Sequence, residues 1–310
     1  MKRATLFAVA VALTAALAFV GCAKQTQDEK ATITSLLAAS GYTDDPHASN
    51  YGAADTALER PDSMTAAASY ELIPFVKFRR YIPAGGVQRL VNVQIPAVSG
   101  GPDSTALATI TWTITGELRT CFDTTTQPIL VWRKPFTDVA TRKVYLEKYG
   151  DRWHLVRISP LALATQNASY HLNIANIHMV SRASHDTFDI STADTMLTKS
   201  RLPWFEPGDT VTVTVTVQSD GDSCWVFLHH GRLGAPRVWR RPYWKTGTWT
   251  FERTWLVRDE TYSRPVVRPS IHDAIGWGTL WADSSKPYVA AAWGIPYIVR
   301  MPTDSTPSDN

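Results

Sequence analysis

Residues 105–118 constrain the fold of this chain more than any other stretch, because apolar and polar side chains alternate along them. A period of two places successive side chains on opposite faces of a β-strand. The pattern therefore predicts a long antiparallel strand with one buried face and one solvated face. The apolar set is Ala106, Ala108, Ile110, Trp112, Ile114 and Leu118, and the polar set is Thr105, Thr109, Thr111, Thr113, Thr115 and Glu117.

A helix is predicted ahead of this strand, over residues 28–39. The apolar residues Ile33, Leu36 and Leu37 are spaced by three and four, which places them on one helical face. Gly41 suits the end of the helix, and residues 42–70 carry little periodicity and are expected to be loop. A helix followed by a long-stranded antiparallel sheet predicts an α+β domain.

A β-hairpin is predicted where residues 143–149 and 152–158 flank Gly150-Asp151, a Gly-first pair that suits a two-residue turn. The hairpin resembles the last hairpin of the nuclear-transport-factor-two-like superfamily, whose fold is a helix-backed cone of curved antiparallel sheet. The resemblance implies a domain of that type over residues 31–159. The expected register pairs Lys148 with Trp153, Leu146 with Leu155 and Val144 with Arg157 on one face, and Tyr145 with Val156, Glu147 with His154 and Tyr149 with Arg152 on the other.

The same resemblance raises the alternative of an enzyme, because some members of the superfamily use carboxylates, His and Tyr inside the cone. In this chain Glu147 would face His154 across the hairpin, with Tyr145 on the same side. The other interpretation is a solvated cross-strand ion pair beside an aromatic ring, which contributes little to stability. Because nothing in the sequence places this face in a pocket, we assign no catalytic residue.

The second half of the chain is predicted to be an all-β sandwich that follows a linker at residues 160–169. Strands at near-regular spacing without helices are typical of a sandwich. The turn and the Thr/Val alternation of residues 206–217 resemble bacterial immunoglobulin-like domains, which implies an immunoglobulin-like sandwich over residues 170–300. The polar residues 301–310 are expected to form a disordered tail. The strands are expected at residues 170–180, 210–217, 224–229, 237–245, 248–257, 271–282 and 288–299.

The N-terminus has the form of a secretory signal, in which a basic start precedes the apolar residues 4–20 and a small residue follows. The stretch that ends in Cys22 resembles a bacterial lipoprotein signal, in which this Cys is acylated and becomes the mature N-terminus. The resemblance implies a signal peptide at residues 1–21, lipid attachment at Cys22 and a polar tether at residues 22–30. The alternative is a transmembrane anchor, but the apolar run is at the short end of what spans a bilayer.

Two further resemblances bear on location and relationship. Ala23 follows the acylated position, where an Asp would resemble an inner-membrane retention signal, so we expect the outer membrane. The closing segments 276–281 and 292–297 resemble those of uncharacterised bacterial lipoproteins that pair the two kinds of domain. That family has no established activity.

Composition and motifs argue against several function classes. The formal net charge of +3 includes Lys2 and Arg3 of the signal, so the exported chain is near neutral, which argues against nucleic acid as a partner. Nucleotide, zinc, calcium and serine-hydrolase motifs are absent, and we expect neither a metal nor a cofactor. Cys121 and Cys224 are expected to be separate buried thiols. The alternative is a disulfide that locks the two domains together.

A candidate ligand surface lies within residues 237–245, where Trp239, Arg241 and Tyr243 share one face of the expected strand. Aromatic rings and cations of this kind can bind sugar rings and anionic groups. The alternative is a protected edge strand, in which charges and proline block aggregation, and we favour it. After a two-residue turn at Thr246-Gly247, the opposite face is expected to fill the core with Val238, Trp244, Trp249, Phe251 and Trp255.

These patterns predict a lipid-anchored cell-envelope protein with a structural or interaction role. A glycan-binding module that uses aromatics of the second domain is the first alternative, and an enzyme with a site in the cone of the first domain is the second. The expected partners are the membrane, through the lipid anchor, and an envelope glycan or another envelope protein.

Overall fold

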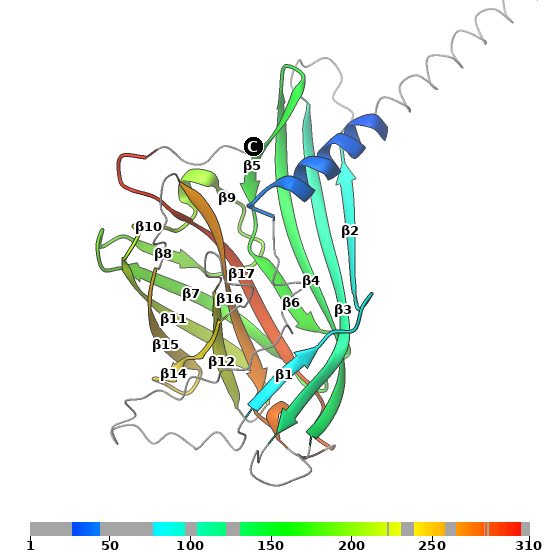
Figure 1. Cartoon of the computed structure of the whole chain (residues 1–310), viewed down its shortest axis with the longest axis vertical. Helices are drawn as coiled ribbons and strands as arrows, with labels where there is room; N and C mark the ends of the chain where they lie inside the picture. The colour runs from blue at the N-terminus through cyan, green and yellow to red at the C-terminus, as the bar shows by residue number, and fades with distance from the viewer. Residues whose placement is uncertain are drawn as a thin grey trace, which may run out of the picture.

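The computed structural model of the protein describes residues 27–43, 77–96, 104–121, 131–221, 223–230, 239–257, 265–281, 283 and 285–304. Within these ranges the chain is mostly β, with one α-helix at residues 27–39 (Figure 1). Two short 3₁₀ helices accompany it, η1 (Lys199–Arg201) and η2 (Trp277–Leu280). The predicted signal peptide, Cys22 and Ala23 lie outside the described residues.

The larger of two sheets has twelve strands and runs through both halves of the chain. The paired strands within this sheet are antiparallel, except that β10 runs parallel to β17. The main path is β1 (Lys77–Tyr81), β3 (Thr105–Cys121), β4 (Val131–Tyr149), β6 (Leu161–Thr165), β17 (Ala290–Val299), β16 (Val266–Gly276), β12 (Cys224–His230) and β13 (Trp239–Pro242). Four strands branch from it: β2 (Val87–Gln94) on β3, β5 (Arg152–Ile158) on β4, β9 (Leu197–Thr198) on β5 and β10 (Trp204–Phe205) on β17.

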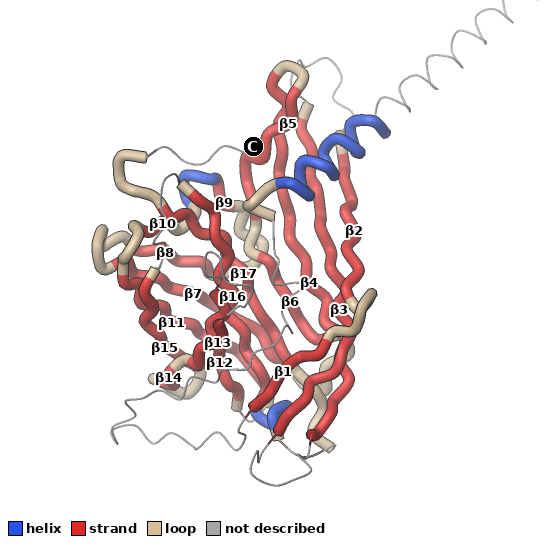
Figure 2. Tube along the Cα trace, in the orientation of Figure 1, coloured by secondary structure: helices blue, strands red, loops and turns tan. Residues whose placement is uncertain are grey.

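This sheet is strongly curled, as the tube in Figure 2 shows. Phe78 on β1 meets Phe227 on β12 with ring centroids 5.2 Å apart, although the two strands lie near opposite ends of the strand order. The curl follows from the twist that long strands accumulate across a sheet. It creates a buried interior onto which β1, β4, β12 and β16 all project side chains.

The smaller sheet forms a second layer against β16 and β17. Phe205 on β10 contacts Trp255 of the smaller sheet at 6.0 Å and Tyr297 on β17 at 5.5 Å, so one aromatic group joins the layers. The Thr/Val alternation predicted here is confirmed, because Val211, Val213, Val215 and Val217 are all buried. The strand order is β14 (Trp244–Lys245), β15 (Thr250–Leu256), β11 (Thr210–Ser219), β7 (Leu172–Ser181) and β8 (Thr187–Ile190).

The helix lies across one end of β2, β3 and β4 (Figure 1). Ile33 and Leu37 are buried, as the sequence predicts. Lys148 Nζ on β4 donates to Glu29 Oε1 at 2.8 Å, which ties the first helical turn to the sheet. Since residues 27–30 are helical, the tether predicted at residues 22–30 is wrong for its last four residues.

The linker predicted at residues 160–169 is wrong for residues 161–165, which form β6. Ala164 pairs with Val139 on one side, and Leu163 pairs with Ala292 on the other. Leu161 and Leu163 are buried, and the alternating Ala162 and Ala164 are small enough for tight strand packing. The composition resembles a linker, but the alternation is that of a short central strand that joins the two predicted domains into one sheet.

The hairpin register is confirmed near the turn and wrong farther from it. Leu146 pairs with Leu155, Glu147 with His154 and Lys148 with Trp153 as predicted. A bulge between Tyr145 and Leu146 then shifts the pairing by one residue, because β5 has an extra residue there.

At the other end of the chain, residues 301–304 form a turn in which Asp304 Oδ2 accepts from the Met301 N–H at 2.8 Å, so this part of the predicted disordered tail is ordered.

Candidate functional site

The predicted ligand surface does not form as expected, because the strand predicted at residues 237–245 divides at Tyr243. β13 ends at Pro242 in the larger sheet, and β14 begins at Trp244 in the smaller one. As the chain crosses between layers, the Tyr243 side chain enters the interior and is only 4% exposed. The backbone of Trp239, in β13, pairs with that of His230 in β12, whereas the Trp239 side chain is outside the described part of the structure. Arg241 is half-buried.

The turn that follows is also longer than predicted. Lys245 pairs with Phe251, and the backbone N–H groups of Thr246 and Gly247 both donate to the Thr250 carbonyl. The register is therefore shifted by three residues from the two-residue turn expected at Thr246-Gly247. Phe251 and Trp255 are buried in the core as predicted, but Trp244 and Trp249 are only half-buried.

Tyr243 belongs to a buried relay with His272 and Ser270. Its hydroxyl lies 2.6 Å from His272 Nδ1, and Ser270 Oγ lies 3.2 Å from Nε2 while donating to the Ile295 carbonyl. Burial lowers the pKa of His272 to about 3, so the ring is neutral at physiological pH. The donors and acceptors then match if Tyr243 donates to Nδ1 and Nε2 carries the proton.

Glu147 and His154 oppose each other as predicted, but they lie on the outer face of the hairpin. The neighbouring positions Leu146 and Leu155 fill the interior. Tyr149 donates a short hydrogen bond to Glu147, and its ring lies 5.5 Å from that of His154. The Tyr145 ring is covered by the Arg157 guanidinium at 5.4 Å. This arrangement is that of a surface aromatic and ionic cluster.

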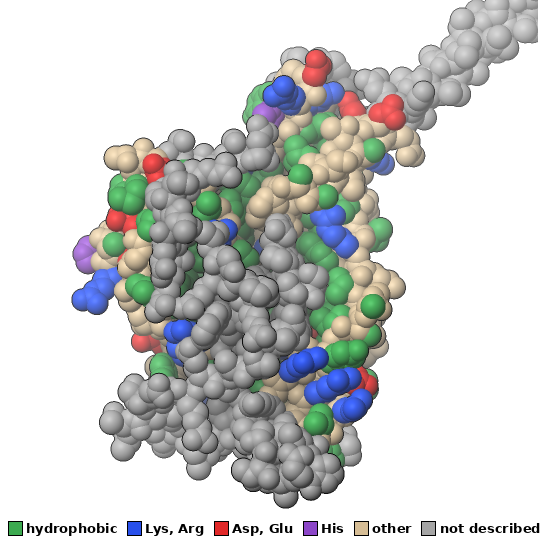
Figure 3. Space-filling view, viewed as in Figure 1, with side chains coloured by type: hydrophobic (Ala, Val, Ile, Leu, Met, Phe, Trp, Pro, Cys, Tyr) green, Lys and Arg blue, Asp and Glu red, His purple; other side chains and the backbone are tan. Residues whose placement is uncertain are grey.

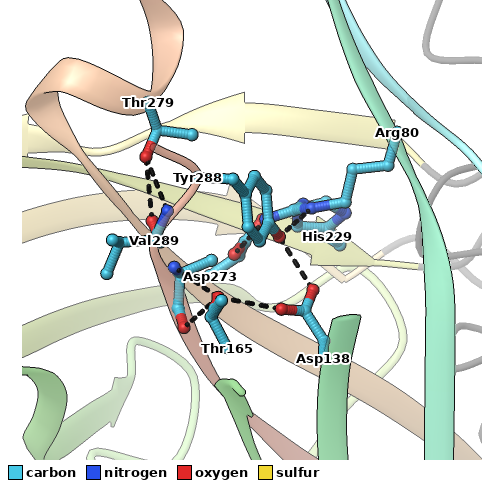
Figure 4. Close-up of polar contacts among 9 residues, drawn as sticks. Arg80, Asp138, Thr165, His229, Asp273, Thr279, Tyr288 and Val289 are labelled. Carbon is cyan, nitrogen blue, oxygen red and sulfur yellow. Dashed lines mark hydrogen bonds and ion pairs between the residues drawn. The ribbon is translucent and has the colours of Figure 1, made fainter. Parts of the chain in front are cut away.

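A buried polar cluster instead occupies the interior of the curled sheet (Figure 4). It begins with Arg80 on β1, whose guanidinium binds both carboxylate oxygens of Asp273 on β16 at 2.7 and 3.1 Å. His229 Nε2 on β12 lies 3.0 Å from Asp273 Oδ2. Paired charge-assisted bonds of this fork geometry are among the stronger hydrogen bonds in proteins. They connect strands that are far apart in the strand order.

The cluster continues through Tyr288, just before β17. Arg80 Nε donates to the Tyr288 hydroxyl at 2.7 Å, and this hydroxyl donates to Asp138 Oδ2 on β4 at 2.8 Å. Thr165 Oγ1 on β6 donates to the other Asp138 oxygen at 2.8 Å. The Phe136 ring stacks on Tyr288 at 4.6 Å and covers one side. We use the name buried polar cluster for Arg80, Asp138, Thr165, His229, Asp273 and Tyr288.

The two carboxylates of the cluster have opposite electrostatics. Burial raises the pKa of Asp138 to about 6, against the attraction of Arg80. Burial would also raise the pKa of Asp273, but the adjacent Arg80 guanidinium and His229 hold it well below its ordinary value. Asp273 is therefore a fixed anion, while Asp138 changes its charge in mildly acidic solution.

The buried polar cluster is suited to holding the sheet together. Its charged members and Tyr288 are at most 4% exposed, and their polar atoms bond to one another. A general acid or base must come within hydrogen-bond distance of a substrate proton, and such burial leaves a substrate no direct approach. The sequence does contain a pattern that indicates a polar interior. Lys134, Asp138 and Arg142 lie at every fourth position of β4, on the same buried face as Phe136 and Val144.

A pocket of about 330 Å³ opens at the end of the molecule that carries η2, and we call it the Trp277 pocket. Its size lies at the small end of the range for ligand sites. The Trp277 ring stacks on Trp225 at 4.9 Å with an interplanar angle of 17°, and it meets Trp281 at 5.7 Å. The lining residues are Ser169, Tyr170, Gly221, Ser223, Trp277, Gly278, Ser285, Lys286 and Pro287.

Glycine shapes the wall of this pocket. A Cβ at Gly276 would lie 1.6 Å from the Tyr170 hydroxyl oxygen, and a Cβ at Gly221 would lie 2.6 Å from the Tyr170 ring. Both positions must therefore be glycine for Tyr170 to pack against the backbone. The motif Gly276-Trp277-Gly278 thus has a local structural role in the wall of the pocket.

One lysine lines the same pocket, and two others form hydrogen bonds to residues of its wall. Lys286 lines it directly, Lys134 on β4 donates to the Gly278 carbonyl at 2.7 Å, and Lys245 on β14 lies 3.2 Å from Ser223 Oγ. Burial lowers the pKa of Lys134 to about 8, so it remains mostly protonated at neutral pH. The pocket therefore combines an aromatic wall with several hydrogen-bond donors.

Within the described residues, no cluster of three or more His, Cys, Asp or Glu side chains could hold a metal ion, and no helix is long and apolar enough to cross a membrane. Cys224 is a buried free thiol, as predicted, and burial raises its pKa to about 12. The Cys121 side chain is outside the described part of the structure. Comparison of the chain with protein-family models, curated proteins and solved structures gives no match.

Proposed function

We propose that this protein is a lipid-anchored protein of the bacterial outer membrane that binds an envelope glycan in the Trp277 pocket. The observation that carries the proposal is the pocket itself, in which the Trp277 ring, supported by stacking on Trp225, adjoins lysine and serine donors. Sugar ligands present both apolar ring faces and hydroxyl groups, which such a wall and rim complement. The interaction role predicted from the sequence is retained, but its site moves from Trp239, Arg241 and Tyr243 to Trp277.

The lipid anchor is supported by the signal-like N-terminus and by the short distance from Cys22 to the folded part. Residues 23–26 separate Cys22 from the helix that begins at residue 27. A fully extended chain reaches about 3.5 Å per residue, so the helix would lie within about 18 Å of the acylated residue. Metabolic labelling with a fatty acid should tag the wild-type protein and leave Cys22→Ser untagged, and a tagged variant would refute the anchor.

We also propose that the two halves derive from a nuclear-transport-factor-two-like region and an immunoglobulin-like sandwich. The helix packed across a curled antiparallel sheet and the closing hairpin of β4 and β5 support the first part. The two β layers that meet at Phe205 support the second. An experimental structure compared with both families tests this relationship.

The glycan-binding proposal is tested by replacing Trp277 with Ala and measuring retention of the purified protein on isolated cell-wall polysaccharide. We expect at least a tenfold loss of affinity, because stacking on the ring would be removed along with one wall of the pocket. Trp249→Ala is the matched control, since Trp249 is also half-buried but lies on the β14–β15 turn. Undiminished retention of Trp277→Ala, with the control also retained, would exclude the pocket as the glycan site.

A further inference from the structure

A row of arginines crosses three adjacent strands at the end of the larger sheet that is far from the helix. Arg79 on β1 is directly opposite Arg119 on β3, and Arg119 is directly opposite Arg133 on β4. In the space-filling view, Lys and Arg side chains gather at this end of the sheet (Figure 3). We call Arg79, Arg119 and Arg133 the arginine row.

The arginine row is unfavourable for the fold taken alone. Like charges directly opposite each other in a sheet are destabilising. Among the described residues, the acidic partner at this place is Glu117, whose Oε2 lies 3.2 Å from Arg119 and 3.5 Å from Arg133. Within that part of the structure, three guanidinium groups share one carboxylate, and an anionic partner would balance the remaining positive charge.

The row also has a fixed geometry. The Arg119 guanidinium lies 3.8 Å from the centre of the Tyr81 ring, and that of Arg79 lies 5.7 Å from the same ring. Cation–π contact and stacking of this kind restrict where the guanidinium groups can point. Adjacent strands are about 4.8 Å apart, so the three side chains leave the sheet from neighbouring backbone positions and can reach one extended anionic partner together.

The Arg133 side chain is 59% exposed, while that of Arg119 is 29% exposed and held by Tyr81 and Glu117. The row is therefore accessible at its Arg133 end and preorganised at its centre. Guanidinium groups bind phosphate through two parallel hydrogen bonds, which makes arginine better suited than lysine to this geometry.

The position of the row separates it from the proposed lipid anchor. The helix binds Lys148 near the start of β3, whereas the row lies near the end of that strand. From Thr105 to Arg119 the strand rises about 3.3 Å per residue, or roughly 46 Å in total. If Cys22 is acylated as proposed, the row lies at the end of the sheet opposite the helix that follows the anchor, which favours a polymer over that membrane as its partner.

We propose that the arginine row is a binding surface for a phosphate-bearing envelope polymer. This surface is distinct from the Trp277 pocket. The row would bind the phosphate backbone of a polyanion, whereas the pocket would bind a sugar ring. In an anchored molecule, the two ends of the larger sheet would join the membrane to that polymer.

The test measures binding of the full chain, held in a neutral detergent, to inorganic polyphosphate at several salt concentrations. Replacing Arg133 with Gln should weaken binding about tenfold, the effect of one lost charge-assisted hydrogen bond. The triple variant Arg79→Gln/Arg119→Gln/Arg133→Gln should abolish binding, and the single variant Arg133→Gln should bind with a reduced salt dependence. Lys143→Gln is the control, because Lys143 is an exposed cation paired with Asp194 elsewhere on the sheet.

The outcomes separate this proposal from its rivals. A triple variant that binds polyphosphate like the wild type overturns the proposal, and so does equal loss in the Lys143→Gln control. Stronger binding to phosphatidylglycerol vesicles than to polyphosphate would assign the row to a membrane surface instead. Thermal melting adds a second readout: Arg79→Gln should not lower the melting temperature, since it removes a like-charge pair. None of these results depends on the Trp277 pocket.

Discussion

The two interiors of this protein are equally buried but are filled by different chemistry. Inside the curled sheet, Arg80 and Asp273 form an ion pair with both side chains at 0% exposure. Between the larger and the smaller sheet, Val211, Val213 and Val215 are buried in the same core as the aromatic rings of Phe205 and Trp255. Apolar packing tolerates many volume-conserving exchanges, whereas a buried ion pair requires both partners in one geometry. The comparison indicates that the curled sheet depends on a few long-range charged contacts, whereas the space between the two sheets depends mainly on apolar packing.

The largest effect is expected from breaking the charged interior on one side. Asp273→Ala should lower the free energy of unfolding by about 3–5 kcal/mol, because Arg80 would lose its buried counter-charge. Urea unfolding measures this loss. The double variant Arg80→Met/Asp273→Leu should recover much of it, since neither charge then remains in the interior. A single variant that costs less than about 1 kcal/mol would show that water or another group reaches Arg80.

The same comparison explains what the sequence could predict. The strand at residues 105–118, the helix, the Gly150-Asp151 turn and the valine face of β11 all follow from local periodicity, and the structure has them. Such patterns record which face of an element is buried. Such patterns are enough to predict an apolar core, because any apolar side chain of suitable size can fill a position in it.

The buried polar cluster could not be predicted in the same way. Arg80 and Asp273 are 193 residues apart in the chain, and no local pattern indicates that they meet. The change of sheet at Tyr243 was missed because a regular alternation was assumed to continue through Pro242. Strand β6 was missed since its short run of Leu and Ala has the composition of a linker. In each case tertiary contacts outweighed the local signal.

The arginine row was missed for a related reason. Each arginine lies on the outer face of its own strand, where an isolated cation is unremarkable. Only the register of β1, β3 and β4 brings Arg79, Arg119 and Arg133 into line. The Trp277 pocket similarly requires Tyr170 and Lys286 to come from distant parts of the chain, although Gly276-Trp277-Gly278 was visible in the sequence.

The smallest expected effect is a pH dependence confined to the charged interior. The pKa of Asp138 is raised to about 6 in the folded protein from 3.8, so the folded state retains a proton that the unfolded chain releases between these values. Protonated Asp138 therefore stabilises the fold at low pH, and this contribution is lost as the pH rises through about 6. Asp273 acts in the opposite sense, since its lowered pKa contributes stability above the unfolded value that is lost in acid.

Asp138→Asn should remove the first of these two contributions while leaving the second. An amide at this position can still accept from the Tyr288 hydroxyl and donate to Thr165 Oγ1. As the pH falls from 7 to 4, the wild type should therefore gain about 2–3 kcal/mol of stability relative to the variant, as measured by urea unfolding at each pH. Val213→Thr, in the apolar interior, is the control: its cost of about 1–3 kcal/mol for a buried hydroxyl should not change over this range. Parallel stability curves for the wild type and Asp138→Asn would mean that Asp138 keeps one protonation state throughout. The stability of the charged interior would then not depend on Asp138 over this pH range. Asp138 and Asp273 would both be ionised, and Arg80 would have to neutralise the two carboxylates at once.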